Sequence, residues 1–345
     1  MSHKIGNSRF AELSEHAKKP HACRLPRHRD PRRDFVVVTC VFNPRGYESR
    51  FRLYEQFARY VAQSDVRLVT VEVTLGDRPF RCTRHDNPDH VQLRTPWELW
   101  HKERALNIGI EHAVRTRPAT RYIAWIDADV TFTRHDWAAA TCEMLQHHHV
   151  VQMFGSFADL NPDEQCTWSA PSMFAVFHQR GFWAEHNPKE PFNKGGHPGL
   201  AWAVRRETLD KLGGLIDICI AGSGDLHMAN ALKGDRDRGD HLTATLDGFT
   251  PEFRQYIAQW ADRCDQVVKQ NIGYVPGSVL HHWHGKAGQR GYRDRWWILE
   301  KHRFNPYADL IRDCSGLWRF AHGREHMADD IRRSLSQRNE DSLDE

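Results

Sequence analysis

The sequence lacks several features that would set the protein apart from ordinary globular proteins. Its eight cysteines include no C-x-x-C pair, which argues against a Cys-type zinc site or a disulfide framework and favours reduced thiols. No apolar run approaches the roughly 18 residues of a membrane span. The first ten residues, MSHKIGNSRF, lack the apolar core of a signal peptide, so we expect a cytoplasmic protein without a membrane span.

The chain also has little net charge, +3 over 345 residues, but the charge is unevenly distributed. Residues 18–33, KKPHACRLPRHRDPRR, are strongly basic and are interrupted by prolines that disfavour a helix. We therefore expect residues 1–33 to form a basic, flexible arm. The polar segment 323–345 is expected to be a frayed tail.

Between these ends, apolar patterns alternate between those of strands and those of helices. The run FVVVTCVF at 35–42 predicts a buried strand, and an amphipathic helix follows from about residue 51. Further strands are predicted at 66–75 and 121–132, with a helix over 96–116 between them. Such alternation predicts an α/β fold with a Rossmann-like, mostly parallel sheet and flanking helices, in a single compact unit.

Polar side chains are predicted at the carboxyl ends of these strands, where parallel sheets bind ligands. Asn43 and Glu72 fall near two strand ends, and Asp127 and Asp129 follow the apolar run YIAWI. Two carboxylates pressed against a core are costly unless a cation or another partner compensates them. Mg²⁺ and Mn²⁺ prefer carboxylate oxygens. An isolated Asp-x-Asp also occurs in turns and helix caps, so its position at a strand end is what favours a metal site.

Four segments, in order, resemble GT-A-fold glycosyltransferases that use an Asp-x-Asp motif and a metal ion, of the family 2-like or galactosyltransferase-like kind. WHKERALNIGIEHA followed by YIAWIDADVTF resembles the nucleotide-sugar half, and GLAWAVRRETLDKLGGL followed by GSGD resembles the acceptor half. VLHHWHG resembles the late metal-binding histidine. The resemblance covers roughly residues 35–300. It implies a GT-A type fold with a nucleotide-sugar-binding half at 34–160 and an acceptor-binding half at 161–322.

The resemblance also implies roles in a metal site. Asp129 would bind the metal, Mn²⁺ or Mg²⁺, and Asp127 would contact the donor ribose or the metal shell. A late histidine would complete the site, and the sequence offers His281, His282 and His284. We favour His284 and then His282, because i and i+2 lie on one face of an extended segment. The metal would stabilise the departing nucleoside diphosphate.

Further residues are expected to bind the donor, by charge, by position at a strand end, or by an aromatic face for the sugar. Each basic residue among them could equally be a solvated surface group. The candidates are Asn43, Glu72, Lys102, Trp202, Lys286, Arg290 and Tyr292, with Arg293 as a further cation.

Asp225, in GSGDLHMA, is the expected catalytic residue. Glycines allow a sharp bend, and an aspartate that starts a helix can be held toward an acceptor, although a plain helix cap is the alternative. An acid at this position is the general base in inverting members of the family, so the resemblance implies inversion. The chain has Gly224 where a Glu-Asp pair is common, and retaining members keep similar metal motifs, so the stereochemistry stays open.

The donor sugar and the acceptor are not fixed by the sequence. A UDP-sugar is the usual donor at an Asp-x-Asp site, and a glycan or protein is the default acceptor. The basic arm would also suit DNA, as in phage enzymes that glycosylate hydroxylated bases. A nucleotidyltransferase would require a glycine-rich loop where the chain has FNPRGYES. A non-catalytic glycan-binding or nucleic-acid-binding protein would have no need of these acids and histidines.

Overall fold

The computed structural model describes residues 31–180, 195–234, 246–286 and 294–343. From Pro31 onward the chain forms one compact unit, as predicted. The expected flexible arm lies outside the described residues except for its last three, which belong to the short 3₁₀ helix η1 (Pro31–Asp34).

A seven-stranded sheet forms the centre of this unit, in the order β10-β6-β9-β4-β1-β2-β3. Four of its pairings are parallel, β1–β2, β1–β4, β2–β3 and β6–β10, so the predicted mostly parallel α/β sheet is confirmed. The strands are β1 (Phe35–Phe42), β2 (Arg67–Leu75), β3 (His90–Thr95), β4 (Tyr122–Ile126), β6 (Val150–Gln152), β9 (Ala201–Arg205) and β10 (Ile272–Tyr274).

Strand β9 runs antiparallel between β4 and β6 and pairs with both of them. It comes from the segment predicted to bind the acceptor, yet it lies inside the sheet that the first half begins. The two sequence halves therefore share one sheet and one core.

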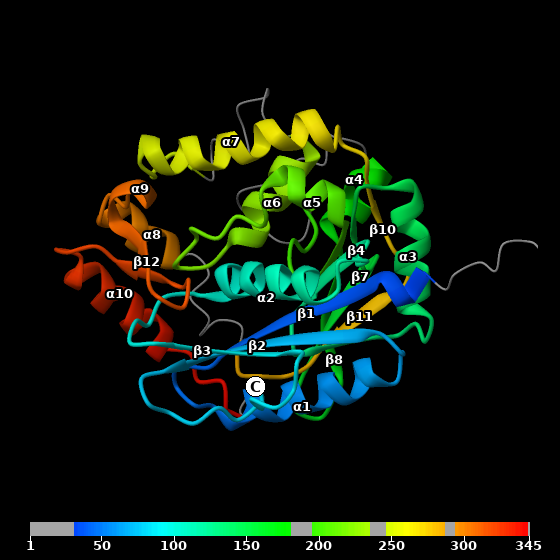
Figure 1. Cartoon of the computed structure of the whole chain (residues 1–345), viewed down its shortest axis with the longest axis horizontal. Coiled ribbons are helices and arrows are strands. Elements are labelled where there is room, and N and C mark those ends of the chain that lie inside the picture. The colour runs from blue at the N-terminus through cyan, green and yellow to red at the C-terminus, as the bar shows by residue number, and fades with distance from the viewer. Residues whose placement is uncertain (1–30, 181–194, 235–245, 287–293, 344–345) are drawn as a thin grey trace, which may run out of the picture. The chain divides into compact units, whose positions relative to one another are not determined.

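Alternation along β1 divides the core into two layers. Val36 and Val38 pack on the side of α2 (Lys102–Thr116), with Leu106. Phe35 and Val37 face α1 (Glu48–Ala62) on the opposite side, because successive strand residues point to opposite faces. Figure 1 shows α2 above the sheet and α1 below it, with further helices covering the α2 side. These helices are α5 (Arg206–Leu212), α6 (Gly224–Lys233) and α7 (Pro251–Val267).

The strand predicted over 121–132 is in fact two strands in different sheets. After β4 the chain turns at residues 127–129 and enters β5 (Val130–Phe132). This strand belongs to a smaller sheet of order β5-β11-β7-β8. The other members are β7 (Ser156–Leu160), β8 (Cys166–Pro171) and β11 (Ser278–His281). The two aspartates therefore lie at the junction between the sheets.

Two sequence predictions about helices need correction. The helix expected from residue 96 begins at Lys102, because the preceding residues make other contacts, among them the Trp100 backbone N–H with the oxygen of Ile220. The tail expected to fray contains α10 (Glu325–Ser336), whose Met327 and Ile331 are buried. The remaining elements are α3 (Trp137–His147), α4 (Met173–Arg180), α8 (Asp294–Lys301), α9 (Pro306–Asp309), β12 (Leu310–Arg312) and β13 (Trp318–Phe320).

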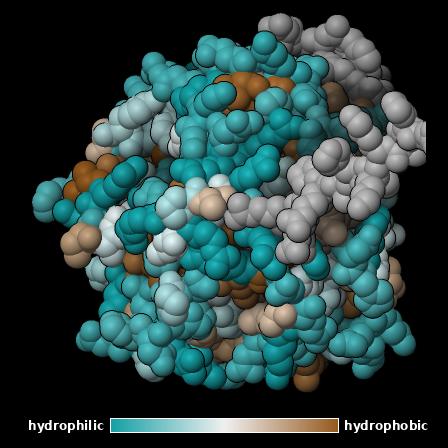
Figure 2. Space-filling model, turned by 45° about the vertical axis from the view of Figure 1, so that its right-hand side comes forward, coloured by the Kyte–Doolittle hydropathy of each residue, from teal (hydrophilic) through white to brown (hydrophobic). Residues whose placement is uncertain are grey.

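The surface shown in Figure 2 is largely hydrophilic, and its apolar residues form small separate patches. Among the helices that the structure describes, none has the length and apolar character needed to cross a membrane. The cysteines within the described ranges form no disulfide bond.

Candidate metal centre and adjoining pockets

The turn between β4 and β5 sends its two carboxylates to different places. Asp127 forms an ion pair with Lys102 in the first turn of α2, at an Oδ1–Nζ distance of 2.5 Å. The Asp129 side chain, only 6% exposed, faces a loop that follows β11. The Asp-x-Asp motif thus serves two neighbouring sites, which we describe in turn.

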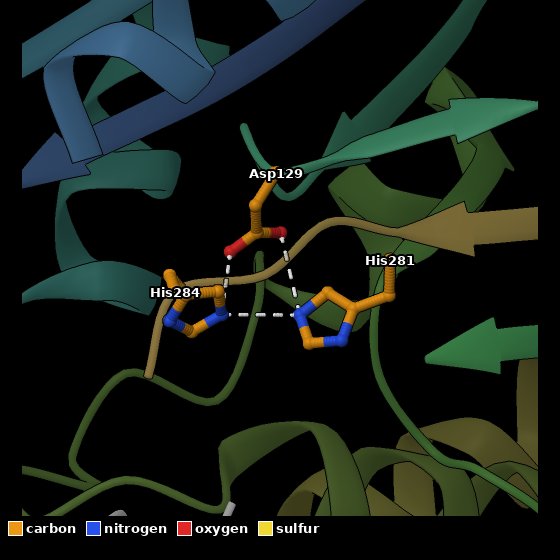
Figure 3. Close-up of side chains that lie close together, drawn as sticks. All are labelled: Asp129, His281 and His284. Carbon is orange, nitrogen blue, oxygen red and sulfur yellow. Dashed lines mark hydrogen bonds and ion pairs between the residues drawn. The ribbon is translucent and has the colours of Figure 1, made fainter. Parts of the chain in front are cut away.

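Asp129, His281 and His284 form a buried cluster (Figure 3). The Nε2 atoms of the two histidines lie 3.1 Å apart. His284 Nε2 is 3.2 Å from Asp129 Oδ2, and His281 Nε2 is 3.9 Å from Asp129 Oδ1. Two imidazole nitrogens and a carboxylate oxygen therefore face one another across a space the size of an ion.

This cluster has the dimensions of a cation site. Ligand atoms on adjacent corners of an octahedron lie about 3 Å apart when each bond is about 2.1 Å long. The three side chains supply one potential ligand each, within 4.8 Å of one another. A cation held on one side by these three atoms would keep other positions open for water or substrate oxygens.

Arg50, in the first turn of α1, contributes a positive charge beside the cluster. Its Nη1 donates to Asp129 Oδ2 at 2.6 Å. A buried carboxylate needs such compensation, and a bound cation would share that role. Nothing in the sequence pattern around Arg50 had indicated this position.

Of the histidines at 281 and 282, the structure brings His281 and not the predicted His282 into the cluster. The His282 ring turns toward Thr131, with Nε2 3.0 Å from the hydroxyl. The backbone N–H of His282 donates to the backbone carbonyl oxygen of Asp129. His281 is the last residue of β11, so its ring and that of His282 point in different directions. His284 lies in the cluster as predicted.

Asp225 lines a separate small pocket, which we call the acid pocket. Its lining includes Lys102, Glu103, Asp127, Gly199, Trp202 and Asp225. Asp225 is in the first turn of α6, whose N-cap is Ser223, so Asp225 is not the plain cap considered above. A Cβ atom at Gly199 would stand 2.5 Å from Asp225 Oδ2. Glycine at position 199 therefore makes room for this carboxylate.

Glu103 is a further acid in the lining of this pocket, and the sequence analysis missed it. It is 4% exposed, and its carboxyl fills the space that a side chain at Gly224 would occupy, 3.0 Å from the position of such a Cβ. Burial raises the pKa of Glu103 to about 8, opposed by Lys102 and assisted by Asp225. Glu103 therefore holds a proton at neutral pH.

We expect this proton to make stability depend on pH. Because the folded state retains the Glu103 proton up to about pH 8 while the unfolded chain releases it near 4.5, the free energy of unfolding should fall as the pH rises through that window. Glu103→Gln removes the group, so its stability relative to the unaltered protein should rise from pH 5 to pH 8, by at most about 1.4 kcal/mol per pH unit. Urea unfolding at several pH values tests this. Parallel curves for the two proteins would contradict it.

A third feature, which we call the arginine pocket, lies at the carboxyl end of β1. It is lined by Arg45, Arg50 and Arg338 together with the aromatic residues Phe42, Tyr47 and Trp100. Asn43 is also in the lining, and its side chain shapes the loop that follows it by accepting the backbone N–H groups of Gly46 and Tyr47. Arg50 lines this pocket and also contacts Asp129 of the metal cluster.

The other sequence candidates have different surroundings. The prediction that Glu72 faces a ligand is not supported, because its carboxylate is committed to a loop and accepts the N–H groups of Arg81, Cys82 and Thr83. Trp202 stacks on Trp125 in the core, and both rings belong to residues that line the acid pocket. Lys286 is half-buried in the loop after His284. Arg290, Tyr292 and Arg293 lie outside the described residues.

No protein-family model and no curated protein matches the chain. Solved structures do match, among them two of Drosophila β1,4-galactosyltransferase 7. A mutant in complex with manganese, UDP-Gal and xylobiose is 13% identical over 56% of this chain and 59% of its own, with a TM-score of 0.27. The catalytic domain with xylobiose is 12% identical over 85% of this chain and 97% of its own, with a TM-score of 0.33. The chain thus spans about three fifths of the length of the first of these. At these sequence identities and TM-scores, the matches do not identify the activity of the protein.

Proposed function

We propose that the protein is a metal-dependent glycosyltransferase of the GT-A type, which moves a sugar from a nucleoside diphosphate donor, a UDP-sugar, to an acceptor hydroxyl. One observation carries this proposal. The turn at residues 127–129 joins a buried two-histidine, one-carboxylate cluster to a pocket that contains Asp225. Metal-dependent, inverting sugar transfer uses both parts, a cation for the departing diphosphate and a carboxylate for the incoming hydroxyl.

Of the two cations expected from the sequence, the ligand set favours Mn²⁺. Mg²⁺ is usually held by carboxylates, water and substrate phosphates, whereas His281 and His284 offer imidazole nitrogens, which suit transition metals better. Asp129, His281 and His284 would hold the ion. When bound, it would stabilise the negative charge that develops on the diphosphate. Ferrous iron also binds such ligand sets, so it belongs in any metal panel.

The arginine pocket is the proposed site of the nucleoside diphosphate. Its aromatic residues suit a base or ribose, and Arg45, Arg50 and Arg338 suit phosphates. Lys102 lines the acid pocket, where it is paired with Asp127. In this arrangement residues 34–160 contribute most of the donor site, and both sequence halves line the acceptor site, with Asp225 coming from residues 161–322.

In the proposed reaction, the acceptor hydroxyl attacks the anomeric carbon while the bond from that carbon to the diphosphate oxygen breaks. The Asp225 carboxylate takes the hydroxyl proton, and the electron pair of the broken bond leaves with the diphosphate. Glu103 lines the same pocket and is neutral at neutral pH. It therefore adds no negative charge that would repel the Asp225 carboxylate. Attack from the face opposite the leaving group would invert the anomeric configuration.

The test is release of nucleoside diphosphate from a panel of sugar nucleotides, with Mn²⁺, Mg²⁺, Fe²⁺ or EDTA. Each donor is offered with a glycan, with a protein and with hydroxymethylated duplex DNA. The samples with DNA test the alternative acceptor. Binding of DNA would depend on the basic arm, most of which lies outside the described residues. We expect Mn²⁺-dependent release from one donor, stimulated by a glycan or a protein. Release in EDTA, or from none of the donors, would contradict the proposal.

A further inference from the structure

The last described residues of the chain return to the metal cluster. We call residues 338–342 the C-terminal segment. Its Asp341 carboxylate accepts the backbone N–H groups of Ser49, at 2.8 Å, and Glu48, at 3.1 Å, and so caps the N-terminus of α1. Burial opposes ionisation of Asp341, but these hydrogen bonds lower its pKa. The segment is therefore fixed to the helix that carries Arg50.

The same segment contacts the loop that carries His284. Trp283 Nε1 donates to the backbone oxygen of Ser342 at 2.6 Å. Gly285 has a φ of +84°, and a Cβ there would stand 2.3 Å from the backbone oxygen of Asn339. Only glycine permits both this conformation and this close approach. The histidine loop is thus shaped to receive the segment.

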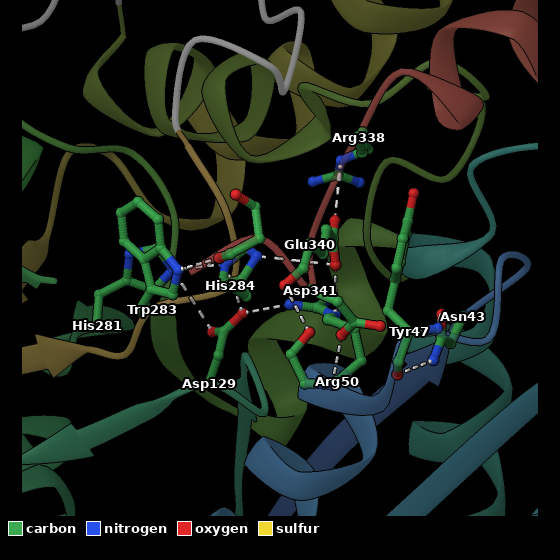
Figure 4. A network of polar contacts seen from close by, with 12 residues as sticks. Asn43, Tyr47, Arg50, Asp129, His281, Trp283, His284, Arg338, Glu340 and Asp341 are labelled. Atoms are coloured by element: carbon green, nitrogen blue, oxygen red, sulfur yellow. Dashed lines mark hydrogen bonds and ion pairs between the residues drawn. The ribbon is translucent and has the colours of Figure 1, made fainter. Parts of the chain in front are cut away.

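Glu340 connects the segment to the cluster itself. Its side chain is 5% exposed, and its carboxylate lies 3.2 Å from Arg50 Nε and 3.0 Å from Arg338 Nε. Its Oε2 is also 3.8 Å from His284 Nδ1, a distance for electrostatic attraction (Figure 4). The Asp159 carboxylate lies beside Nδ1 of His281, at a distance of 2.5 Å. Each histidine of the cluster therefore has a carboxylate on the side away from Asp129.

We propose that the C-terminal segment is a built-in part of the metal centre and that Glu340 is a positioning residue for His284 and Arg50. A carboxylate beside Nδ1 favours a proton on that nitrogen and leaves Nε2 free to bind a cation. Glu340 also fixes the guanidinium that contacts Asp129. This inference rests on the metal centre of the proposed function but not on any sugar donor or acceptor.

Mn²⁺ titration of the full chain, followed by electron paramagnetic resonance, tests the inference without turnover. Removal of an outer carboxylate of this kind typically costs about 10–100-fold in metal affinity, and we expect a loss in that range for Glu340→Gln. Asp329→Asn is the matched control, since Asp329 forms an exposed ion pair with Arg332 on α10, and its Mn²⁺ affinity should be unchanged. Glu340→Asp, which keeps the charge, should recover part of the loss.

A thermal unfolding curve for each variant separates positioning from folding. The inference requires weaker Mn²⁺ binding by Glu340→Gln at a temperature where the variant is fully folded. Unchanged affinity would overturn it, and so would tighter binding, which would show that the segment competes with the ion. If the unaltered protein bound no Mn²⁺, the metal centre and this inference would both fall. Normal Mn²⁺ binding without release from any donor would overturn only the proposed function.

Discussion

Asp129→Asn should abolish Mn²⁺ binding at micromolar concentrations and reduce turnover to background. The carboxylate is the only anionic member of the three-residue cluster, and a neutral amide is a much weaker ligand for a divalent cation. We expect affinity to fall by more than about 100-fold, beyond the effect of losing an outer carboxylate. The variant should remain folded, because Asn keeps the shape and Arg50 retains Glu340 as a partner. Mn²⁺ titration and diphosphate release measure the two effects.

His282→Ala is the matched control for this experiment. His282 is adjacent in sequence to a cluster member, but its ring contacts Thr131, so its loss should leave Mn²⁺ affinity within a few-fold of the original. His281→Ala should instead resemble Asp129→Asn. If His282→Ala lost the metal and His281→Ala kept it, the assignment drawn from the sequence would be right and the one drawn from the structure wrong.

Asp225→Asn should lower kcat by about 10²–10⁴-fold, the usual contribution of a general base, with little change in Mn²⁺ affinity. The reason is its position in the acid pocket, where Gly199 leaves room for its Oδ2. The change removes the acceptor for the hydroxyl proton and preserves the size of the side chain. Steady-state kinetics with saturating donor and acceptor would measure the effect, and the same Mn²⁺ titration would show whether the metal centre is intact.

A rate within about tenfold of the original would exclude Asp225 as the general base, since proton transfer to a positioned group contributes more than that. An equal loss of Mn²⁺ affinity would contradict the separation of the acid pocket from the metal cluster.

Much of the first half of the fold could be predicted because its signals are local. β1 occupies the predicted residues 35–42, and β2 agrees with the predicted strand to within a few residues. The sequence analysis missed β3, whose six residues, HVQLRT, alternate too briefly to stand out. The continuous apolar pattern through residues 121–132 concealed a change of sheet, which only tertiary pairing decides.

The site could be predicted where a motif marks it. Asp129 and His284 lie in the cluster, and Asp225 lines the acid pocket. The choice of His282 over His281 assumed that the extended segment continues through residue 284, but β11 ends at His281 and the chain then turns. No local sequence pattern marked four neighbouring residues as part of a site, namely Arg50, Glu103, Asp159 and Glu340. Each reaches the site through contacts between segments far apart in the sequence.

The hydrogen bond from Ser49 Oγ to the backbone oxygen of Glu340 joins residues 291 positions apart. This separation bears on how the protein is made. Contacts between such distant segments form late, because a long loop must close first. During synthesis, α1 and the aspartate turn leave the ribosome well before the residues that cap α1 and hold the histidine loop. We therefore expect metal acquisition to follow synthesis and to favour chains that are complete through residue 342.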